Sequence, residues 1–165
     1  MCTRDQFCLV AVLWDPVTQV FFASTIPVGE RRKTMITAGP QKAPVWWSKV
    51  DNPKKETYTH AEDAVYFNWE SVAPANRVQG GVYHGGLRIG VYGSKVEAKI
   101  VNGKQVKNAK GQVQPALTTP AQWSLCTVSD KSPACAEVAR SLRITPVPMG
   151  YYRRDTGTDL PLGIL

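Results

Sequence analysis

Histidine and acidic residues are scarce in this sequence of 165 residues. Only two histidines occur, His60 and His84, so a site that uses imidazole has few candidates. The 20 Lys and Arg residues outnumber the 13 Asp and Glu residues, which gives a formal net charge of +7. This charge favours a polyanionic partner, nucleic acid more than an anionic membrane surface, although a solvated lysine-rich surface would have the same composition.

The sequence also lacks long hydrophobic runs, repeats and low-complexity tracts. No run is long enough for a transmembrane helix, and the charged start, Met1 to Asp5, is unlike a secretory signal peptide. The four cysteines are spaced irregularly, which does not indicate a disulfide framework. We therefore expect one domain over residues 1–165 that binds no membrane, is cytoplasmic or nuclear, or is delivered as an effector without a signal peptide.

The first half of the chain predicts a hairpin, a loop and a helix. Apolar runs at residues 7–13 and 20–26 flank turn residues and predict an antiparallel hairpin. Residues 27–55, rich in proline, glycine and basic side chains, predict a long ordered loop with at most short elements. A helix is then predicted to begin at Thr59, because Thr59 and Glu62 fit a capping box ahead of apolar residues at helical spacing.

The second half predicts strands, an inserted hairpin and a further helix. Residues 87–92 alternate as a strand, and Asn102-Gly103 is a strong hairpin signal. Lysines at positions 95, 99, 104, 107 and 110 would make this hairpin a basic ribbon. Strands are predicted at residues 122–128 and 144–147, with a helix between them that Ser132 and Pro133 would start. This order predicts helices covering a mixed sheet.

Four residues suggest a hydrolytic metal site. His60 and Glu62 lie two apart, so one is a candidate nitrogen ligand and the other a proton carrier, while Cys126 and Cys135 are candidate thiolate ligands. Zinc with three protein ligands and one open position lowers the pKa of water to ~7, and a nearby carboxylate moves protons. The alternatives are that Glu62 only caps the helix and that both cysteines are small core residues.

His60-Ala61-Glu62 followed by Pro133-Ala134-Cys135 resembles the zinc-dependent cytidine deaminase-like superfamily. Its signature is His-x-Glu followed by Pro-Cys-x-x-Cys, and His-Ala-Glu is nearest to the polynucleotide cytosine deaminases, AID/APOBEC-like and toxin-like. The resemblance implies an α/β three-layer sandwich, with a mixed sheet of about five strands, helices on both faces and, in this chain, an inserted β-hairpin. It also implies that Glu62 is catalytic and that zinc is the cofactor.

The cysteine spacing departs from this signature. The pattern expects two cysteines three apart, but Ser132 and Val138 stand three residues before and after Cys135. The nearest other thiol is Cys126, nine residues earlier. Either an enlarged loop brings Cys126 to the place of the first cysteine, or the site has lost a ligand; we favour the enlarged loop.

The resemblance implies a deaminase that converts cytosine to uracil in nucleic acid, with single-stranded DNA as the expected substrate. The alternatives are a deaminase of free nucleosides or bases, and an inactive nucleic-acid-binding domain on the same scaffold. Aromatic side chains could stack on splayed bases, although tryptophans in this loop could equally pack it onto the sheet. The predicted substrate-binding residues are Ser24, Trp46, Trp47, Ala61, His84 and Tyr151.

Overall fold

The fold opens with the predicted hairpin, whose turn is closed by an aspartate. In the computed structural model, which describes residues 8–50, 60–73, 86–94, 96–126 and 135–148, strands β1 (Cys8–Asp15) and β2 (Val20–Thr25) pair antiparallel. The Asp15 carboxylate accepts hydrogen bonds from the Val17 N–H at 2.9 Å and from the Trp69 Nε1–H at 3.2 Å. One buried side chain therefore fixes the turn and joins it to the helical layer.

The sheet has five strands and is mostly antiparallel. Its order is β2-β1-β3-β8, and the short β9 pairs parallel with the start of β3. The three later strands are β3 (Arg88–Ser94), β8 (Ala121–Trp123) and β9 (Thr145–Pro146). The prediction of a mixed α/β protein with about five strands is thus confirmed, while a deaminase-like fold remains an expectation.

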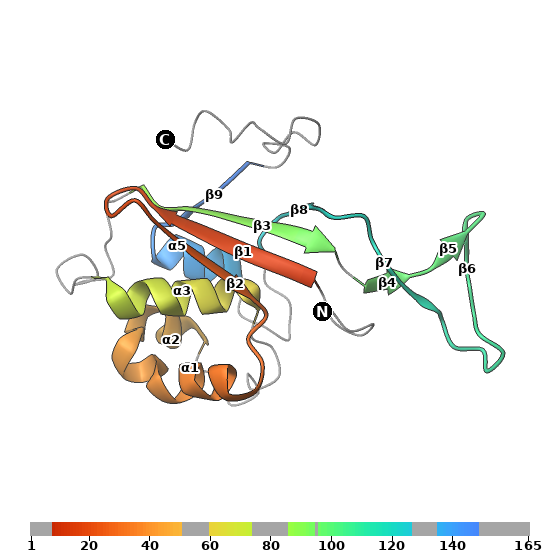
Figure 1. The fold of residues 1–165 in the computed structure, drawn as a ribbon, viewed down its shortest axis with the longest axis horizontal. Coiled ribbons are helices and arrows are strands. Elements are labelled where there is room, and N and C mark those ends of the chain that lie inside the picture. Colours follow the sequence, from red (N-terminus) through yellow and green to blue (C-terminus); the bar gives the residue numbers. More distant parts are fainter. Residues whose placement is uncertain (1–7, 51–59, 74–85, 95, 127–134, 149–165) are drawn as a thin grey trace.

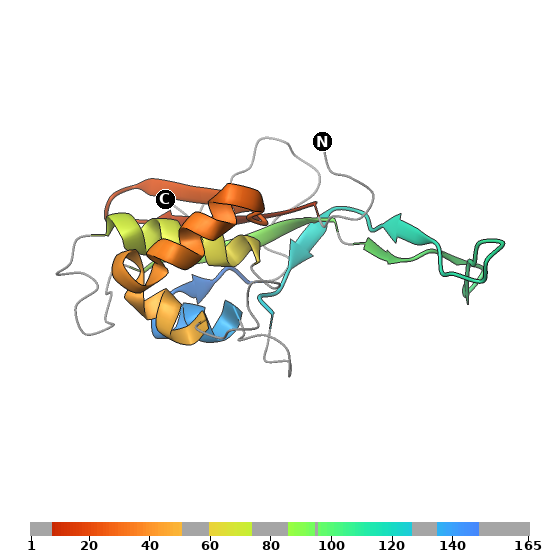
Figure 2. The ribbon, with the colours of Figure 1, turned by 90° about the horizontal axis from the view of Figure 1, so that it is seen from below.

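The four described helices lie on one face of the sheet (Figures 1 and 2). Ala11 and Leu13 of β1 are fully buried on this face, whereas Val10, which points the other way, is 39% exposed. Such alternation is typical of an antiparallel sheet covered on one side. The helices are α1 (Gly29–Lys42), α2 (Pro44–Val50), α3 (Ala61–Val72) and α5 (Cys135–Ser141). In the described part of the chain, the expectation of helices on both faces is therefore wrong.

The prediction of a long loop over residues 27–55 is wrong for residues 29–50, which form α1 and α2. Packing overrides the unfavourable local propensities, because Met35 and Trp46 bury all but 1% of their surface against the core. Gly39 permits the close approach of these helices: a Cβ at this position would lie 2.6 Å from Cε3 of Trp47. The glycine that suggested a loop is a packing residue.

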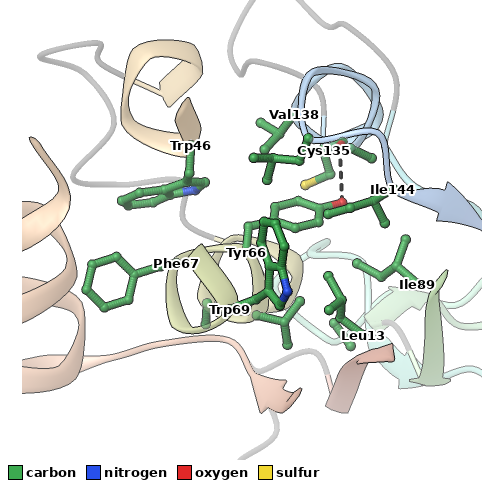
Figure 3. Close-up of a cluster of buried hydrophobic side chains, with 14 of the residues drawn as sticks. Leu13, Trp46, Tyr66, Phe67, Trp69, Ile89, Cys135, Val138 and Ile144 are labelled. Carbon is green, nitrogen blue, oxygen red and sulfur yellow. Dashed lines mark hydrogen bonds between the residues drawn. The ribbon is translucent and has the colours of Figure 1, made fainter. Parts of the chain in front are cut away.

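Helix α3 packs against β1 and β2, lies between these strands and helices α1 and α2, and carries much of the core. Figure 3 shows Tyr66 and Trp69 of α3 among Leu13 and Ile89 of the sheet and Val138 of α5. All five side chains are at most 1% exposed. Because α3 begins at the predicted site, this packing holds the site residues in place. None of the helices in the described ranges is both long and apolar enough to span a membrane.

The predicted hairpin at Asn102-Gly103 is confirmed and forms the end of an arm that projects from the sheet (Figures 1 and 2). Asn102 and Gly103 have φ angles of 50° and 74°, the left-handed backbone that such a two-residue turn requires. The strands of the arm are β4 (Val96–Ala98), β5 (Ile100–Val101), β6 (Lys104–Gln105) and β7 (Pro115–Leu117). β4 pairs with β7, and β5 pairs with β6.

Candidate metal centre and its cavity

The start of α3 is capped by Asp63 and not by Glu62. The backbone N–H of His60, the N-cap residue, donates to Asp63 Oδ2 at 2.7 Å, and the Trp46 Nε1–H donates to Asp63 Oδ1 at 3.0 Å. The predicted capping box of Thr59 and Glu62 named the wrong acidic residue, because Asp63 and not Glu62 accepts the hydrogen bond. Thr59 lies outside the described residues. The alternative in which Glu62 serves as the helix cap is removed.

Cys126 and Cys135 are neighbours in space although nine residues separate them. The N–H of Cys135 donates to Cys126 Sγ at 3.1 Å, and the N–H of Ala136 donates to the Cys126 carbonyl at 3.2 Å. The hydroxyl of Tyr66, buried in α3, donates to the Cys135 carbonyl at 3.2 Å (Figure 3). These bonds hold the start of α5 against both Cys126 and α3. Ser132 and Pro133, predicted to start this helix, lie outside the described residues.

His60, Cys126 and Cys135 form a cluster that can hold a metal ion. His60 Nδ1 lies 3.2 Å from Cys135 Sγ and 3.5 Å from Cys126 Sγ, and the three ligand atoms all lie within 4.8 Å of one another. Tetrahedral zinc with ordinary bond lengths would hold a nitrogen and a sulfur ligand ~3.6 Å apart. Two thiols and an imidazole are also donors that zinc accepts. The residues present therefore fit a zinc ion, and the structure brings the predicted ligands together.

In the absence of a metal, the three groups of the cluster shift one another's pKa values. A hydrogen bond with Cys126 raises the pKa of His60 to about 9, against an opposing effect of burial. A hydrogen bond from Cys135, with a further one from His60, lowers the pKa of Cys126 to about 4. The same Cys126 thiolate, together with burial, raises the pKa of Cys135. Thiolate is the form that binds metals, so the lowered pKa of Cys126 favours binding, whereas His60 and Cys135, whose pKa values are raised, must each lose a proton to bind.

A cavity of about 530 Å³ opens beside the cluster. This volume lies within the usual range of small-molecule sites. Its polar wall contains His60, Glu62 and Cys126, and its apolar walls contain Leu9, Ile26, Ala61, Val91, Trp123 and Leu125. Glu62 is 6% exposed, and burial raises the pKa of its carboxyl group. Glu62 does not cap the helix, and its pKa is raised. Such a carboxylate is suited to accepting and returning a proton.

Trp123 is a cavity residue that the sequence analysis missed. Its Nε1–H donates to the Gly93 carbonyl at 2.8 Å, which fixes the indole at the cavity wall. The available signal was its place three residues before Cys126, near the start of the strand predicted over residues 122–128. Sequence reasoning instead chose the adjacent pair Trp46 and Trp47.

Three of the four predicted substrate-binding residues that the structure describes are not among the residues that line the cavity. Ala61 does line it. Trp46 is 1% exposed and packs edge-on against Phe67 at 5.6 Å, which leaves no ring face for a base. Trp47 packs over Gly39, and the Ser24 hydroxyl donates to the neighbouring Thr25 carbonyl. The interpretation of Trp46 as a base-stacking residue is therefore wrong, and neither Trp47 nor Ser24 is among the residues that line the cavity. The remaining two, His84 and Tyr151, lie outside the described residues.

Comparison of the chain with protein-family models, with curated proteins and with solved structures found no match in any of the three. The resemblance to the cytidine deaminase-like superfamily consequently rests on the motif residues alone. The geometry of the metal cluster and the cavity is independent of that resemblance. A functional proposal must therefore be argued from this geometry.

Proposed function

We propose that this protein is a zinc-dependent hydrolytic deaminase that converts cytosine to uracil in nucleic acid, with single-stranded DNA as the expected substrate. The observation that carries the proposal is the convergence of an imidazole and two thiols within 4.8 Å, at the wall of a cavity that also contains the buried carboxylate of Glu62. The superfamily that the motif resembles uses the same groups for this reaction.

The reaction replaces the C4 amino group of cytosine with oxygen from water. Zinc held by His60, Cys126 and Cys135 would supply hydroxide at neutral pH by lowering the pKa of a water molecule to ~7. Glu62 takes the proton of that water and delivers it to N3 of the ring as the C4–O bond forms. The new C4 hydroxyl then gives up its proton, which Glu62 passes to the amino group; the C4–N bond breaks to release ammonia, and C4 becomes the carbonyl of uracil. Water is consumed and ammonia is released, so the atoms balance.

The cavity walls favour a planar base as the substrate. Trp123 presents a fixed aromatic ring, and Leu9, Val91 and Leu125 are apolar. A base enters such a pocket only after it leaves its stack, which costs least in a single strand. The net charge of +7 further supports a polyanionic substrate.

The test is deamination of a single-stranded DNA oligonucleotide that contains one cytosine, with uracil detected by mass spectrometry. The wild-type protein is expected to bind one zinc ion per chain and to form uracil. Glu62→Gln is expected to keep zinc and to lose about 10²- to 10⁴-fold in rate, because it cannot carry a proton. Glu30→Gln, on the exposed surface of α1, is the matched control and should retain full activity.

Three results would contradict the proposal. A fully active Glu62→Gln variant would remove the carboxylate from the mechanism. Purified protein that binds no zinc would remove the metal. Activity on free cytidine that is insensitive to salt, with none on the oligonucleotide, would assign the site to a small substrate.

A further inference from the structure

The arm ends in two tips that share one junction. Here we call residues 99–114 the fork. At its junction the N–H of Lys99 donates to the Gln114 carbonyl, the N–H of Val106 to the Lys99 carbonyl, and the N–H of Gln114 to the Val106 carbonyl, each at 2.8 Å. This closed ring of three hydrogen bonds ties the two tips together. The first tip is the Asn102-Gly103 hairpin.

The second tip turns at Asn108 and has an ordered backbone. Asn108 Oδ1 accepts hydrogen bonds from the N–H groups of Lys110 and Gln112 at 2.9 and 3.0 Å. Gly111 adopts a φ of 75°, and an isolated bridge joins Lys107 to Val113. The tip therefore holds its lysines in a defined arrangement, and a partner that binds them has little backbone freedom to remove.

The fork concentrates positive charge. Its lysines, at 99, 104, 107 and 110, are all exposed, and residues 99–114 contain no acidic side chain. Within the described residues, the salt bridge found is Lys33–Glu30 on α1, far from the fork in the chain. These ammonium groups are thus available to anions from solution. Their partner should carry several negative charges at separate points.

The fork is continuous along the chain with strands that line the cavity. From the fork the chain passes through β7 into β8, and β8 ends at Trp123, which lines the cavity together with Cys126 three residues later. β3 precedes the arm and pairs with β8, and its Val91 also lines the cavity. A polymer held on the fork would therefore lie along elements that lead to the candidate site.

We propose that the fork is a phosphate-binding handle for a nucleic-acid strand, another part of which supplies the base that enters the cavity. This deepens the proposed function and rests on it in assigning the cavity a base from the same strand. Lysine contacts to phosphates give affinity without reading sequence. The fork contains no aromatic residue, so it stacks no base and its contribution is electrostatic.

An anionic membrane is the rival partner, because Ile100 and Val101 are 63% and 50% exposed near the first tip. Membrane-interface anchors are typically rich in Trp and Tyr, which residues 99–114 lack. The two tips also offer charges at separate points, as a phosphate backbone requires. The nucleic-acid strand is therefore the favoured partner, and vesicle binding is one outcome of the test.

The test compares two triple variants in binding a labelled mixed-sequence single-stranded DNA of about 30 nucleotides, by fluorescence anisotropy across a KCl series. The fork variant is K104Q/K107Q/K110Q, and the matched control is K33Q/K42Q/K49Q on α1 and α2. Both lower the net charge from +7 to +4. The plot of log K against log salt has a negative slope, and each lost phosphate contact makes it shallower by about 0.7. The fork variant should therefore have a slope shallower than that of the wild type by up to ~2, and the control should change much less.

All binding is measured with Glu62→Gln protein, so it does not depend on turnover. A chain that fails to deaminate can still bind through the fork, and an active chain can fail this test. Equal losses in the two variants would overturn the proposal, because net charge would then explain the binding. So would fork-dependent binding to phosphatidylserine vesicles without binding to DNA. Restored binding in K104R/K107R/K110R would show that the charge, and not a change in folding, is responsible.

Discussion

Glu62 and Asp63 are adjacent at the start of α3, but conversion of each carboxylate to its amide should affect the stability of the fold differently. Asp63 accepts two hydrogen bonds with its buried carboxylate, one from the His60 N–H and one from the Trp46 Nε1–H. Glu62 faces the cavity, and burial raises its pKa. We therefore expect Asp63→Asn to destabilise the fold and Glu62→Gln to leave its stability nearly unchanged.

The magnitude follows from the donors that each change leaves without an acceptor. The amide introduced by Asp63→Asn has one oxygen in place of two, so a buried N–H must face an NH₂ group, at a cost of about 1–3 kcal/mol. For a chain of this length that corresponds to a fall in Tm of about 2–4 °C for each kcal/mol. Glu62→Gln removes a charge whose burial is unfavourable and breaks no helix cap, so the expected change is within about 0.5 kcal/mol.

Urea denaturation followed by tryptophan fluorescence measures both variants, at one fixed zinc concentration. The two substitutions are matched, because each converts a carboxylate to its amide on the same helix turn. If Glu62→Gln lost as much stability as Asp63→Asn, Glu62 would be a structural residue and the catalytic assignment would lose its main support. If Asp63→Asn were neutral, the capping geometry would be unimportant.

Three further predictions concern packing, metal and pH. Gly39→Ala should destabilise the fold by about 1–3 kcal/mol, seen as a lower Tm, because its Cβ would lie 2.6 Å from the Trp47 ring. Cys126→Ser and Cys135→Ser should each lower the zinc content measured by mass spectrometry and remove the rise in Tm that zinc produces in the wild type. Burial raises the pKa of Glu70 despite two backbone hydrogen bonds; a carboxyl whose folded pKa is raised loses its stabilising contribution as pH rises. Glu70→Gln leaves one of the two backbone N–H donors without an acceptor and should be less stable than wild type, but its deficit in urea denaturation should shrink as pH rises above 4.5.

Features set by short-range chemistry were predictable from the sequence. The opening hairpin follows from two apolar runs around a turn, and the Asn102-Gly103 turn follows from the backbone angles that these residues accept. The members of the candidate metal cluster were also predictable: the scarcity of histidine singled out His60, and the resemblance pointed to Cys126 and Cys135. The hairpin, the turn and the His60–Glu62 pair each depend on a few neighbouring residues.

Features set by contacts between distant residues were not predictable. The helices of residues 29–50 form because Trp46 and Met35 reach the core, which outweighs the glycine and prolines of this segment. Asp63 replaces Glu62 as the cap because Trp46, seventeen residues earlier, donates to the same carboxylate. Trp123 lines the cavity only because β8 pairs with β3. Local patterns contain none of this information.

The nine-residue separation of Cys126 and Cys135 adds a loop-closure entropy that is small compared with the free energy of binding a metal ion. Lengthening a loop from three residues to nine adds about 1 kcal/mol of closure entropy, from (3/2)RT ln 3. Structural zinc sites bind with about 10–16 kcal/mol. The hydrogen bonds from the N–H groups of Cys135 and Ala136 to Cys126 further offset the cost of closure. A metal responds to the positions of its ligand atoms and not to their spacing in the sequence, so the departure from the Pro-Cys-x-x-Cys pattern is no argument against a zinc centre in this chain.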